Sequence, residues 1–315
     1  MVKTAIIPAA GLGTRLLPIS AAVAKELLPL GRKPTLQWIG EELGAAGLDR
    51  FVLVSSPAKT ELPRLFQWPP GLGEKYRAPQ YGLWAAGPYS QTRIDIALQH
   101  QQLGLGHAVL CARDLVGDEP FVVALGDCVF GPPEQGNVTR RLVELFEAHQ
   151  ADAVLAFERV PREKVSRYGI AAPLARAAEP GAGARTRLTR EQMAEGRDEA
   201  AEPGAGTRNR LTEEVFTLGD LIEKPSLEAA PSNLAVAARY VFSPRLWPHL
   251  VQLSSEKAAR GVGGEIQLTD AIRSLIRSGA KVLGWEVQQQ RRYDVGTYET
   301  YVEAQLAFGE EEGNH

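Results

Sequence analysis

The stretch TAIIPAAGLGTR, residues 4–15, decides the fold of this 315-residue chain. Its first part, Thr4–Ala9, is apolar and strand-like, and the loop Ala10–Gly13 follows it directly. A glycine-rich turn at the end of a strand exposes backbone N–H groups that can bind phosphate. Arg15 follows the loop, and Lys25 stands ten residues later. Two cations at this spacing favour a ligand with several phosphates, although a tight turn with solvated cations produces the same pattern.

The loop differs from two common phosphate-binding motifs. A dinucleotide-binding loop needs a third glycine where Leu16 stands, and Pro18 interrupts the helix that should follow. A Walker loop closes with a lysine and a hydroxyl residue, and this pair is missing. The sequence therefore indicates a phosphate-binding loop of another family.

Short apolar segments alternate with segments of helical periodicity along the remaining chain. After the first strand, the segments that read as strands are 51–54, 121–125, 153–157, 235–242 and 281–287. This alternation predicts an α/β fold with a mostly parallel central sheet flanked by helices. We expect residues 1–309 to form a single domain and residues 310–315 to form a disordered tail.

One segment departs from this alternation. Residues 177–189 and 200–212 match at eleven of thirteen positions, AAEPGAGARTRLT against AAEPGAGTRNRLT. Two copies that are poor in apolar residues cannot build a solenoid or bury enough surface to order themselves. The sequence predicts a mobile surface insert over residues 176–214, with a regulatory or partner contact as one possible use.

Composition excludes several classes of protein. The chain is 44% hydrophobic and 23% charged, with a net charge of −3, which is typical of a globular protein. The balance leaves no broad basic field for a nucleic acid, and no apolar run is long enough to span a membrane. Two cysteines cannot form a disulfide framework, so we expect a cytoplasmic protein with reduced thiols.

The glycine loop, together with Lys25-Glu26-Leu27-Leu28-Pro29, resembles the opening signature of bacterial UTP–glucose-1-phosphate uridylyltransferases, which are sugar-nucleotide pyrophosphorylases. Seven further matches follow in the order of that family: Leu103–Ala108, Gly126-Asp127, Tyr168–Ile170, Glu223–Pro225, Ser232–Ala235, Glu265–Ala271 and Arg292–Asp294. The resemblance covers nearly the whole chain except residues 60–95 and the insert. It implies the Rossmann-like nucleotidyltransferase fold of that family.

The resemblance implies attack by the phosphate of glucose 1-phosphate on the α-phosphorus of UTP, giving UDP-glucose and pyrophosphate. The sugar phosphate is already mostly dianionic at pH 7, so the reaction needs no general base. It needs cations and a carboxylate-bound Mg²⁺ to bring polyanions together in line. The resemblance also implies that the protein is a homodimer or homotetramer.

The site residues that the resemblance implies fall into four groups. The catalytic residues are Arg15 and Lys25 at the leaving pyrophosphate, Lys224 at the sugar phosphate, and Asp127. Asp127 also ends an apolar strand, where a carboxylate is costly unless it is paired or binds a metal, so with Asp294 it is the expected Mg²⁺ ligand. The expected nucleotide contacts are Ala9, Ala10, Gly11, Gly13, Glu26, Gln99 and Gly104, of which Gln99 and Gly104 read the uracil. The expected sugar-phosphate contacts are Gly169, Glu223, Lys224 and Asn233.

Three of these residues also have a simpler explanation. Asp127 could cap a turn, Asp294 could lie on a surface turn, and Gln99 could be an exposed strand residue. Cys128 replaces an acidic residue that many relatives carry after the metal aspartate, and Ser55–Lys59 lacks the glycine-arginine step usual in the family. Two alternatives therefore stay open: an enzyme that uses another sugar 1-phosphate or dTTP, and a catalytically silent regulator that binds a nucleotide sugar.

Overall fold

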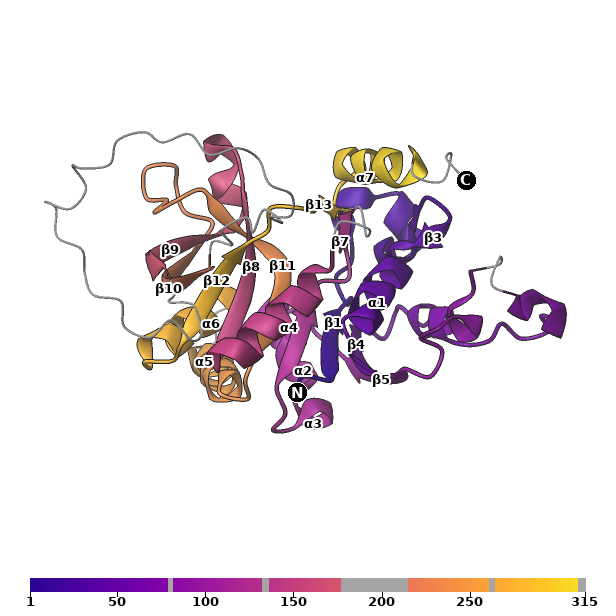
Figure 1. Ribbon diagram of the computed structural model, residues 1–315, viewed down its shortest axis with the longest axis horizontal. Coiled ribbons are helices and arrows are strands. Elements are labelled where there is room, and N and C mark those ends of the chain that lie inside the picture. Colours follow the sequence, from indigo (N-terminus) through magenta and orange to yellow (C-terminus); the bar gives the residue numbers. More distant parts are fainter. Residues whose placement is uncertain (79–81, 132–135, 177–214, 261–263, 311–315) are drawn as a thin grey trace, which may run out of the picture.

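A computed structural model describes the chain over residues 1–78, 82–131, 136–176, 215–260 and 264–310 (Figure 1). Its main feature is a nine-stranded sheet in the order β5-β4-β1-β6-β11-β8-β12-β10-β9. The strands of this sheet are β1 (Thr4–Pro8), β4 (Arg50–Ser55), β5 (Arg93–Leu98), β6 (Phe121–Ala124), β8 (Ala153–Arg159), β9 (Gly169–Arg176), β10 (Val215–Glu223), β11 (Leu234–Phe242) and β12 (Val282–Glu286).

Smaller elements complete the fold. Two short antiparallel ladders join β2 (Pro29–Leu30) to β3 (Lys33–Pro34) and β7 (Cys128–Gly131) to β13 (Arg291–Asp294). The α-helices are α1 (Thr35–Ala45), α2 (Leu105–Cys111), α3 (Arg113–Val116), α4 (Val138–His149), α5 (Leu246–Arg260), α6 (Leu268–Arg277) and α7 (Tyr298–Glu310). Short 3₁₀ turns are η1 (Thr14–Leu16), η2 (Ile19–Ala21), η3 (Lys25–Leu27), η4 (Leu62–Phe66), η5 (Glu74–Arg77), η7 (Trp84–Ala86) and η9 (Arg162–Arg167).

The sheet is mixed, which corrects the expectation of a mostly parallel one. Strands β5, β4, β1 and β6 are parallel, and so are β8 and β12, but β11 runs antiparallel to both β6 and β8. Strand β10 is likewise antiparallel to β12 and β9. All nine residues of β11 are buried. A strand buried on both faces has the continuous apolar sequence typical of parallel sheets, so composition did not reveal its direction.

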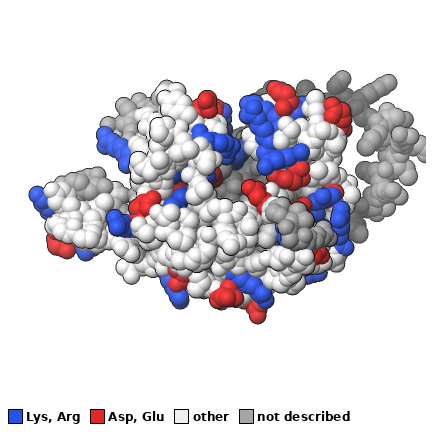
Figure 2. Space-filling model, turned by 180° about the vertical axis from the view of Figure 1, so that it is seen from behind, with Lys and Arg blue, Asp and Glu red and all other residues white. Residues whose placement is uncertain are grey.

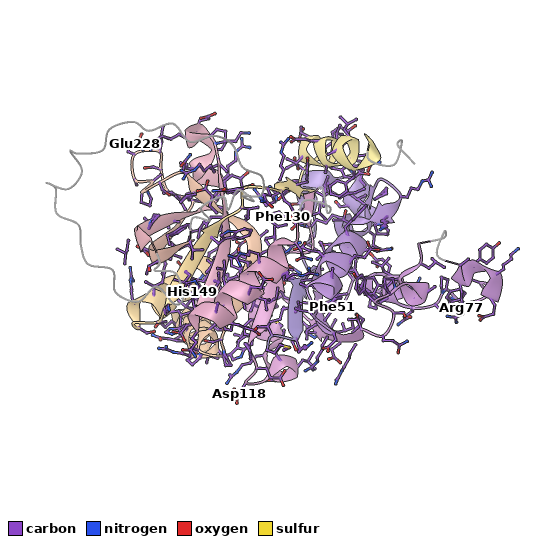
Figure 3. All side chains as sticks on the ribbon, viewed as in Figure 1. Phe51, Arg77, Asp118, Phe130, His149 and Glu228 are labelled. Atoms are coloured by element: carbon purple, nitrogen blue, oxygen red, sulfur yellow. The ribbon has the colours of Figure 1, made fainter. Side chains whose placement is uncertain are left out.

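Alternate residues of the strands point to two separate cores. Ala5 and Ile7 of β1 pack on one face with α1, α4 and α7, whereas Ile6 packs on the other face with α2, α5 and α6. Figure 1 shows α1 and α4 in front of the sheet and α7 over the β7–β13 ladder. Figure 3 shows Phe51 in the layer beneath α1 and Arg77 at the tip of a segment that projects from the sheet. The result is a three-layer arrangement of helices, sheet and helices.

The predicted insert and tail lie largely outside the described residues. Arg176, the first residue of the predicted insert, is the last residue of β9, and residues 177–214 are not described. Glu310 ends α7, and residues 311–315 are not described. Within the described ranges, none of the helices combines the length and apolarity needed to cross a bilayer.

A buried ion pair and its hydrogen bonds join two helices and two strands behind the carboxyl end of β6. Arg239 of β11 has no exposed side-chain surface, and its Nη2 lies 2.7 Å from Oε2 of Glu42 on α1. The same nitrogen donates to the carbonyl of Cys128 at 3.0 Å, and Thr139 Oγ1 of α4 donates to Glu42 at 2.6 Å. Arg239 thus fixes the strand that follows Asp127.

Replacement of Glu42 by alanine should lower the free energy of unfolding by about 3–5 kcal/mol, because it leaves the Arg239 charge buried without its partner. The double substitution Glu42→Leu with Arg239→Met should cost less than Glu42→Ala alone, since no charge is then stranded. Urea unfolding followed by circular dichroism measures both. Glu144→Ala, which breaks the more exposed Arg141–Glu144 pair, is the matched control and should cost under about 1 kcal/mol. A loss that small for Glu42→Ala would contradict the assignment.

Candidate active site

The glycine loop lies where β1 and β6 end side by side. Gly126 follows β6, and its N–H donates to the carbonyl of Pro8 at 3.1 Å. A Cβ at position 126 would lie 2.9 Å from that same carbonyl oxygen, so only glycine allows the two strand ends to approach so closely. Gly13 adopts a φ of 67°, and Ser20 Oγ donates to its carbonyl at 2.8 Å. These contacts place the loop directly beside Asp127.

Lys25 and Asp127 form an ion pair across this junction. Nζ of Lys25 donates to Oδ2 of Asp127, and the two side chains are only 13% and 19% exposed. Burial alone would lower the pKa of Lys25, but the charges of Asp127 and Glu26 raise it above its ordinary value. Burial would raise the pKa of Asp127, but the charge and hydrogen bond of Lys25 lower it. Both groups therefore stay ionised near neutral pH.

Asp127 and Asp294 face each other across Cys128, because Cys128 pairs with Asp294 in the β7–β13 ladder. Cys128 Sγ lies 3.7 Å from Oδ1 of Asp127 and 3.6 Å from Oδ2 of Asp294. Burial raises the pKa of the Cys128 thiol well above its ordinary value, and both carboxylates add to the shift. The thiol therefore stays protonated, and two carboxylates are the hard oxygen donors here.

This donor pair can hold a divalent cation. Among the described residues, His, Cys, Asp and Glu side chains form no group of three or more suited to a metal ion. Mg²⁺ does not need such a group, because it binds through one or two carboxylates together with water and substrate phosphates. The chemistry of Asp127 and Asp294 fits that requirement.

Lys59 is a site residue that the sequence analysis missed. Its Nζ donates to both carboxylate oxygens of Glu26, at 3.0 and 2.8 Å, and to the carbonyl of Ala9 at 2.8 Å. Glu26 is 1% exposed, and burial raises its pKa against the opposing charges of Lys59 and Lys25. Glu26 therefore lies beneath the loop, and Ala9 and Ala10 are buried above it. The missing signal was the altered Ser55–Lys59 segment, which was read only as a departure from the family.

Gln99 and Gly104 lie together after the end of β5, which lies on the opposite side of β1 from β6 in the sheet. The backbone N–H of Gln99 donates to Ser55 at the end of β4, and its side chain is 3% exposed. Its Nε2 donates to the Gly104 carbonyl at 3.1 Å. Gly104 has a φ of 94°, and a Cβ there would lie 2.7 Å from the Cβ of Glu265. The simpler explanation of Gln99, an exposed strand residue, is wrong.

Gly169, Glu223 and Thr269 form a second cluster. Gly169 pairs with Glu223 at the start of β9, and a Cβ at position 169 would lie 3.3 Å from Glu223 Oε2 and 2.9 Å from Thr269 Cγ2. Lys224 has a φ of 45°, and Nζ of its 57% exposed side chain lies 3.7 Å from Glu223 Oε1. Thr269 is 8% exposed, and its Oγ1 has no hydrogen-bond partner. Thr269 was quoted only within a longer motif, so its role was also missed.

Asn233, in contrast, is used by the fold. Its Nδ2 donates to the Val160 carbonyl at 3.2 Å, and its Oδ1 accepts from Arg159 at 3.3 Å. Both polar atoms of the amide are occupied by the end of β8. Neither of these bonds joins Asn233 to Glu223 or Gly169.

Arg292 links the two clusters. Its guanidinium donates to Glu158 at 2.7 Å, lies 3.8 Å from Asp294 and stacks on the ring of Tyr168 at 5.2 Å. Tyr168 precedes Gly169, so a chain of contacts runs from the glycine loop through Asp127 and Asp294 to the second cluster. Arg292 belongs to the Arg292–Asp294 motif, but its role depends on contacts between segments far apart in the sequence.

Arg15 is an exposed cation of the site. Its side chain is exposed, and Nη2 lies 3.0 Å from the place that a Cβ of Gly296 would occupy, next to Asp294. On the face seen in Figure 2, the molecule is hollowed between its two halves, and Lys and Arg side chains line both sides. Arg15, Lys25 and Arg292 place positive charge beside the partly buried carboxylates of Asp127 and Asp294, which suits a polyanionic ligand with a divalent cation.

A separate cavity of about 1110 Å³ lies between α1, β7 and residues 82–89. Trp38, Trp84, Tyr89 and Phe130 line it, but none of the expected site residues does. This cavity therefore does not contain the carboxylates and cations described above. We place the active site at those charged groups, because they bring together the chemistry that a phosphate ligand requires.

The chain is similar to known nucleotidyl transferases. The family model described as nucleotidyl transferase matches residues 4–178 and 209–311. UTP–glucose-1-phosphate uridylyltransferase of Bacillus subtilis (strain 168) is 34% identical over 310 residues, covering 98% of this chain and 91% of that protein.

Two solved structures are similar along nearly the whole chain. A UDP-glucose pyrophosphorylase complexed with UDP-glucose is 30% identical with a TM-score of 0.76, covering 99% of this chain and 100% of that one. A UTP-bound enzyme from Acinetobacter baumannii is 29% identical with a TM-score of 0.75, covering 99% and 94%. The chain therefore belongs to the nucleotidyl transferase family, in the group of bacterial UTP–glucose-1-phosphate uridylyltransferases.

Proposed function

We propose that the protein transfers the uridylyl group of UTP to glucose 1-phosphate, with UDP-glucose and pyrophosphate as products. A single observation carries the proposal: the Lys25–Asp127 pair joins the glycine loop to a continuous row of contacts that ends at Gly169 and Glu223. A nucleotide triphosphate and a sugar phosphate bound at the two ends would meet near Asp127 and Asp294. The relatives named above support this choice of substrates.

In the proposed reaction, an oxygen of the sugar phosphate attacks the α-phosphorus of UTP. The new P–O bond forms as the bond to the β-phosphate oxygen breaks, and pyrophosphate leaves with that electron pair. Arg15 and Lys25 stabilise the charge that develops on pyrophosphate, because both are cations beside the glycine loop. Lys224 holds the attacking phosphate. Asp127 and Asp294 hold Mg²⁺, which supplies further positive charge to the phosphates when bound.

The substrate ends are assigned by their polar groups. Gln99 and Gly104 meet the uracil, while the loop residues Ala9–Gly13 follow the ribose and phosphates. Glu223 and the backbone at Gly169 meet the sugar hydroxyls, and the unpartnered hydroxyl of Thr269 adds a group at the same place. Glu26 acts through Lys59 on the Ala9 carbonyl rather than by open contact with the nucleotide.

The proposal predicts pyrophosphate release by the purified protein with UTP, glucose 1-phosphate and Mg²⁺, and loss of that release when EDTA removes the metal. Parallel reactions with dTTP and with galactose 1-phosphate measure specificity. Faster turnover with either alternative would replace the assigned substrate. Absence of release by folded protein that still binds UDP-glucose would favour the silent regulator instead.

Arg15→Ala should lower kcat by roughly 100-fold and leave the Kd for UDP-glucose within about threefold. The asymmetry arises because UDP-glucose lacks the leaving pyrophosphate, so Arg15 contributes mainly to the transition state. Steady-state kinetics and calorimetric titration measure the two quantities. Arg113→Ala, an exposed arginine on α3, is the control and should change neither. Equal losses of turnover and UDP-glucose binding would contradict this role.

Asp127→Asn should lower kcat by at least about 100-fold and raise the Mg²⁺ concentration needed for half-maximal UTP binding, because one anionic ligand is lost. It also leaves Lys25 without its carboxylate. Calorimetric titration of UTP at several Mg²⁺ concentrations reports metal binding separately from turnover. Asp114→Asn on α3 is the control. Unchanged Mg²⁺ dependence in Asp127→Asn would remove this residue from the metal site.

A further inference from the structure

The side-chain amide of Gln99 has an orientation that its neighbours determine. Its nitrogen and its oxygen are distinguished by the partner at 3.1 Å, the carbonyl of Gly104. A backbone carbonyl can only accept a hydrogen bond, so the amide atom beside it is the donor, Nε2. The assignment follows from the chemistry of Gly104 and does not depend on how the amide was drawn.

The same nitrogen lies 3.0 Å from Nδ1 of His107, on the first turn of α2. Because Nε2 of Gln99 is a donor, Nδ1 must accept, which requires a neutral His107 with its proton on Nε2. Burial lowers the pKa of His107, which favours this neutral form. Both amide hydrogens of Gln99 are then used, one by Gly104 and one by His107.

The remaining polar atom of Gln99 is Oε1, which has no hydrogen-bond partner within the described part of the chain. It is not among the fully buried side-chain atoms that lack a partner, so part of its surface is accessible. The only group that Gln99 offers to a ligand is therefore a hydrogen-bond acceptor.

We propose that His107 is a positioning residue that locks the Gln99 amide with its oxygen toward the base, and so selects bases that carry an N–H donor at that edge. This inference rests on the proposed function, in which Gln99 meets the pyrimidine. Uracil has an N–H at N3 and bonds the acceptor, whereas N3 of cytosine is itself an acceptor and is repelled. Thymine shares the N–H of uracil, so the device rejects CTP without distinguishing UTP from dTTP.

The test compares kcat/KM for UTP and CTP in wild type, His107→Leu and His107→Asn. Leucine removes the acceptor, so we expect the UTP-to-CTP ratio to fall about tenfold, the worth of one ordinary hydrogen bond. The loss should appear in KM for UTP, with kcat within about twofold. Asparagine offers Oδ1 near the place of Nδ1 and should restore the ratio to within about threefold of wild type.

His249→Leu is the matched control. Its ring is held by a comparable hydrogen bond between Nδ1 and Ser274 Oγ at 2.8 Å. This bond joins α5 to α6 and does not involve Gln99. It should leave the UTP-to-CTP ratio unchanged. An unchanged ratio in His107→Leu, or a ratio in His107→Asn as low as in His107→Leu, would overturn the proposal.

A second measurement reads the protonation of His107 directly in the wild-type protein. In protein labelled with ¹⁵N-histidine, the His107 resonances, assigned by their absence in His107→Asn, should show an unprotonated Nδ1 and a protonated Nε2. Protonated Nδ1 would overturn the proposal. Failure of wild type to turn over UTP with any sugar phosphate would instead contradict the proposed function, and the ¹⁵N spectrum would still decide the orientation of Gln99.

Discussion

The buried ion pair between Lys25 and Asp127 is the interaction on which the rest of the site depends. It joins η3, which begins with Lys25, to Asp127 between β6 and β7. It keeps both groups charged despite their burial. Two opposite charges at this depth are tolerated only as a pair. The fold therefore carries an anion for a metal and a cation for phosphate at the same point before any ligand arrives. Binding would exchange one partner for another without exposing a lone buried charge.

Three further ion pairs support the residues around the Lys25–Asp127 pair. Lys59 neutralises Glu26 beneath the loop, Glu158 neutralises Arg292 beside Asp294, and Glu42 neutralises Arg239 behind Cys128. Each of these supporting ions is held in the protein interior or at its edge, whereas Arg15 is exposed, and Lys224 is exposed with its Nζ 3.7 Å from Glu223 Oε1. The cations that hold the frame are thus distinct from those available to a ligand. This division explains why Arg15 should affect turnover while Glu42 should affect stability.

The sequence predicted the parts of this site that lie close along the chain. The glycine loop, the cations after it and the carboxylate after an apolar strand can be found from local pattern, and the structure brings Asp127 and Lys25 into contact. It could not predict Lys59, because the contact of Lys59 with Glu26 depends on β4 lying beside β1. The antiparallel β11 was missed because burial on both faces hides strand direction. Asn233 was assigned to the sugar site, but the bonds to Val160 and Arg159 that occupy it arise only when β11 pairs with β8.

The segment 265–269 shows how one short stretch can couple the two substrate ends. Ile266 accepts from Gly106 at 2.7 Å and donates to Leu103 at 2.6 Å, which encloses the loop that carries Gly104. Three residues later, Thr269 begins the contact with Gly169 at the sugar end. Ile266 is bonded on either side of Gly104, whose carbonyl accepts from Gln99. Only two residues separate Ile266 from Thr269, so a shift of this segment would move Gly104 and the Thr269 hydroxyl together. In the proposed function, recognition of the base and recognition of the sugar are therefore coupled through this segment, which leads into α6.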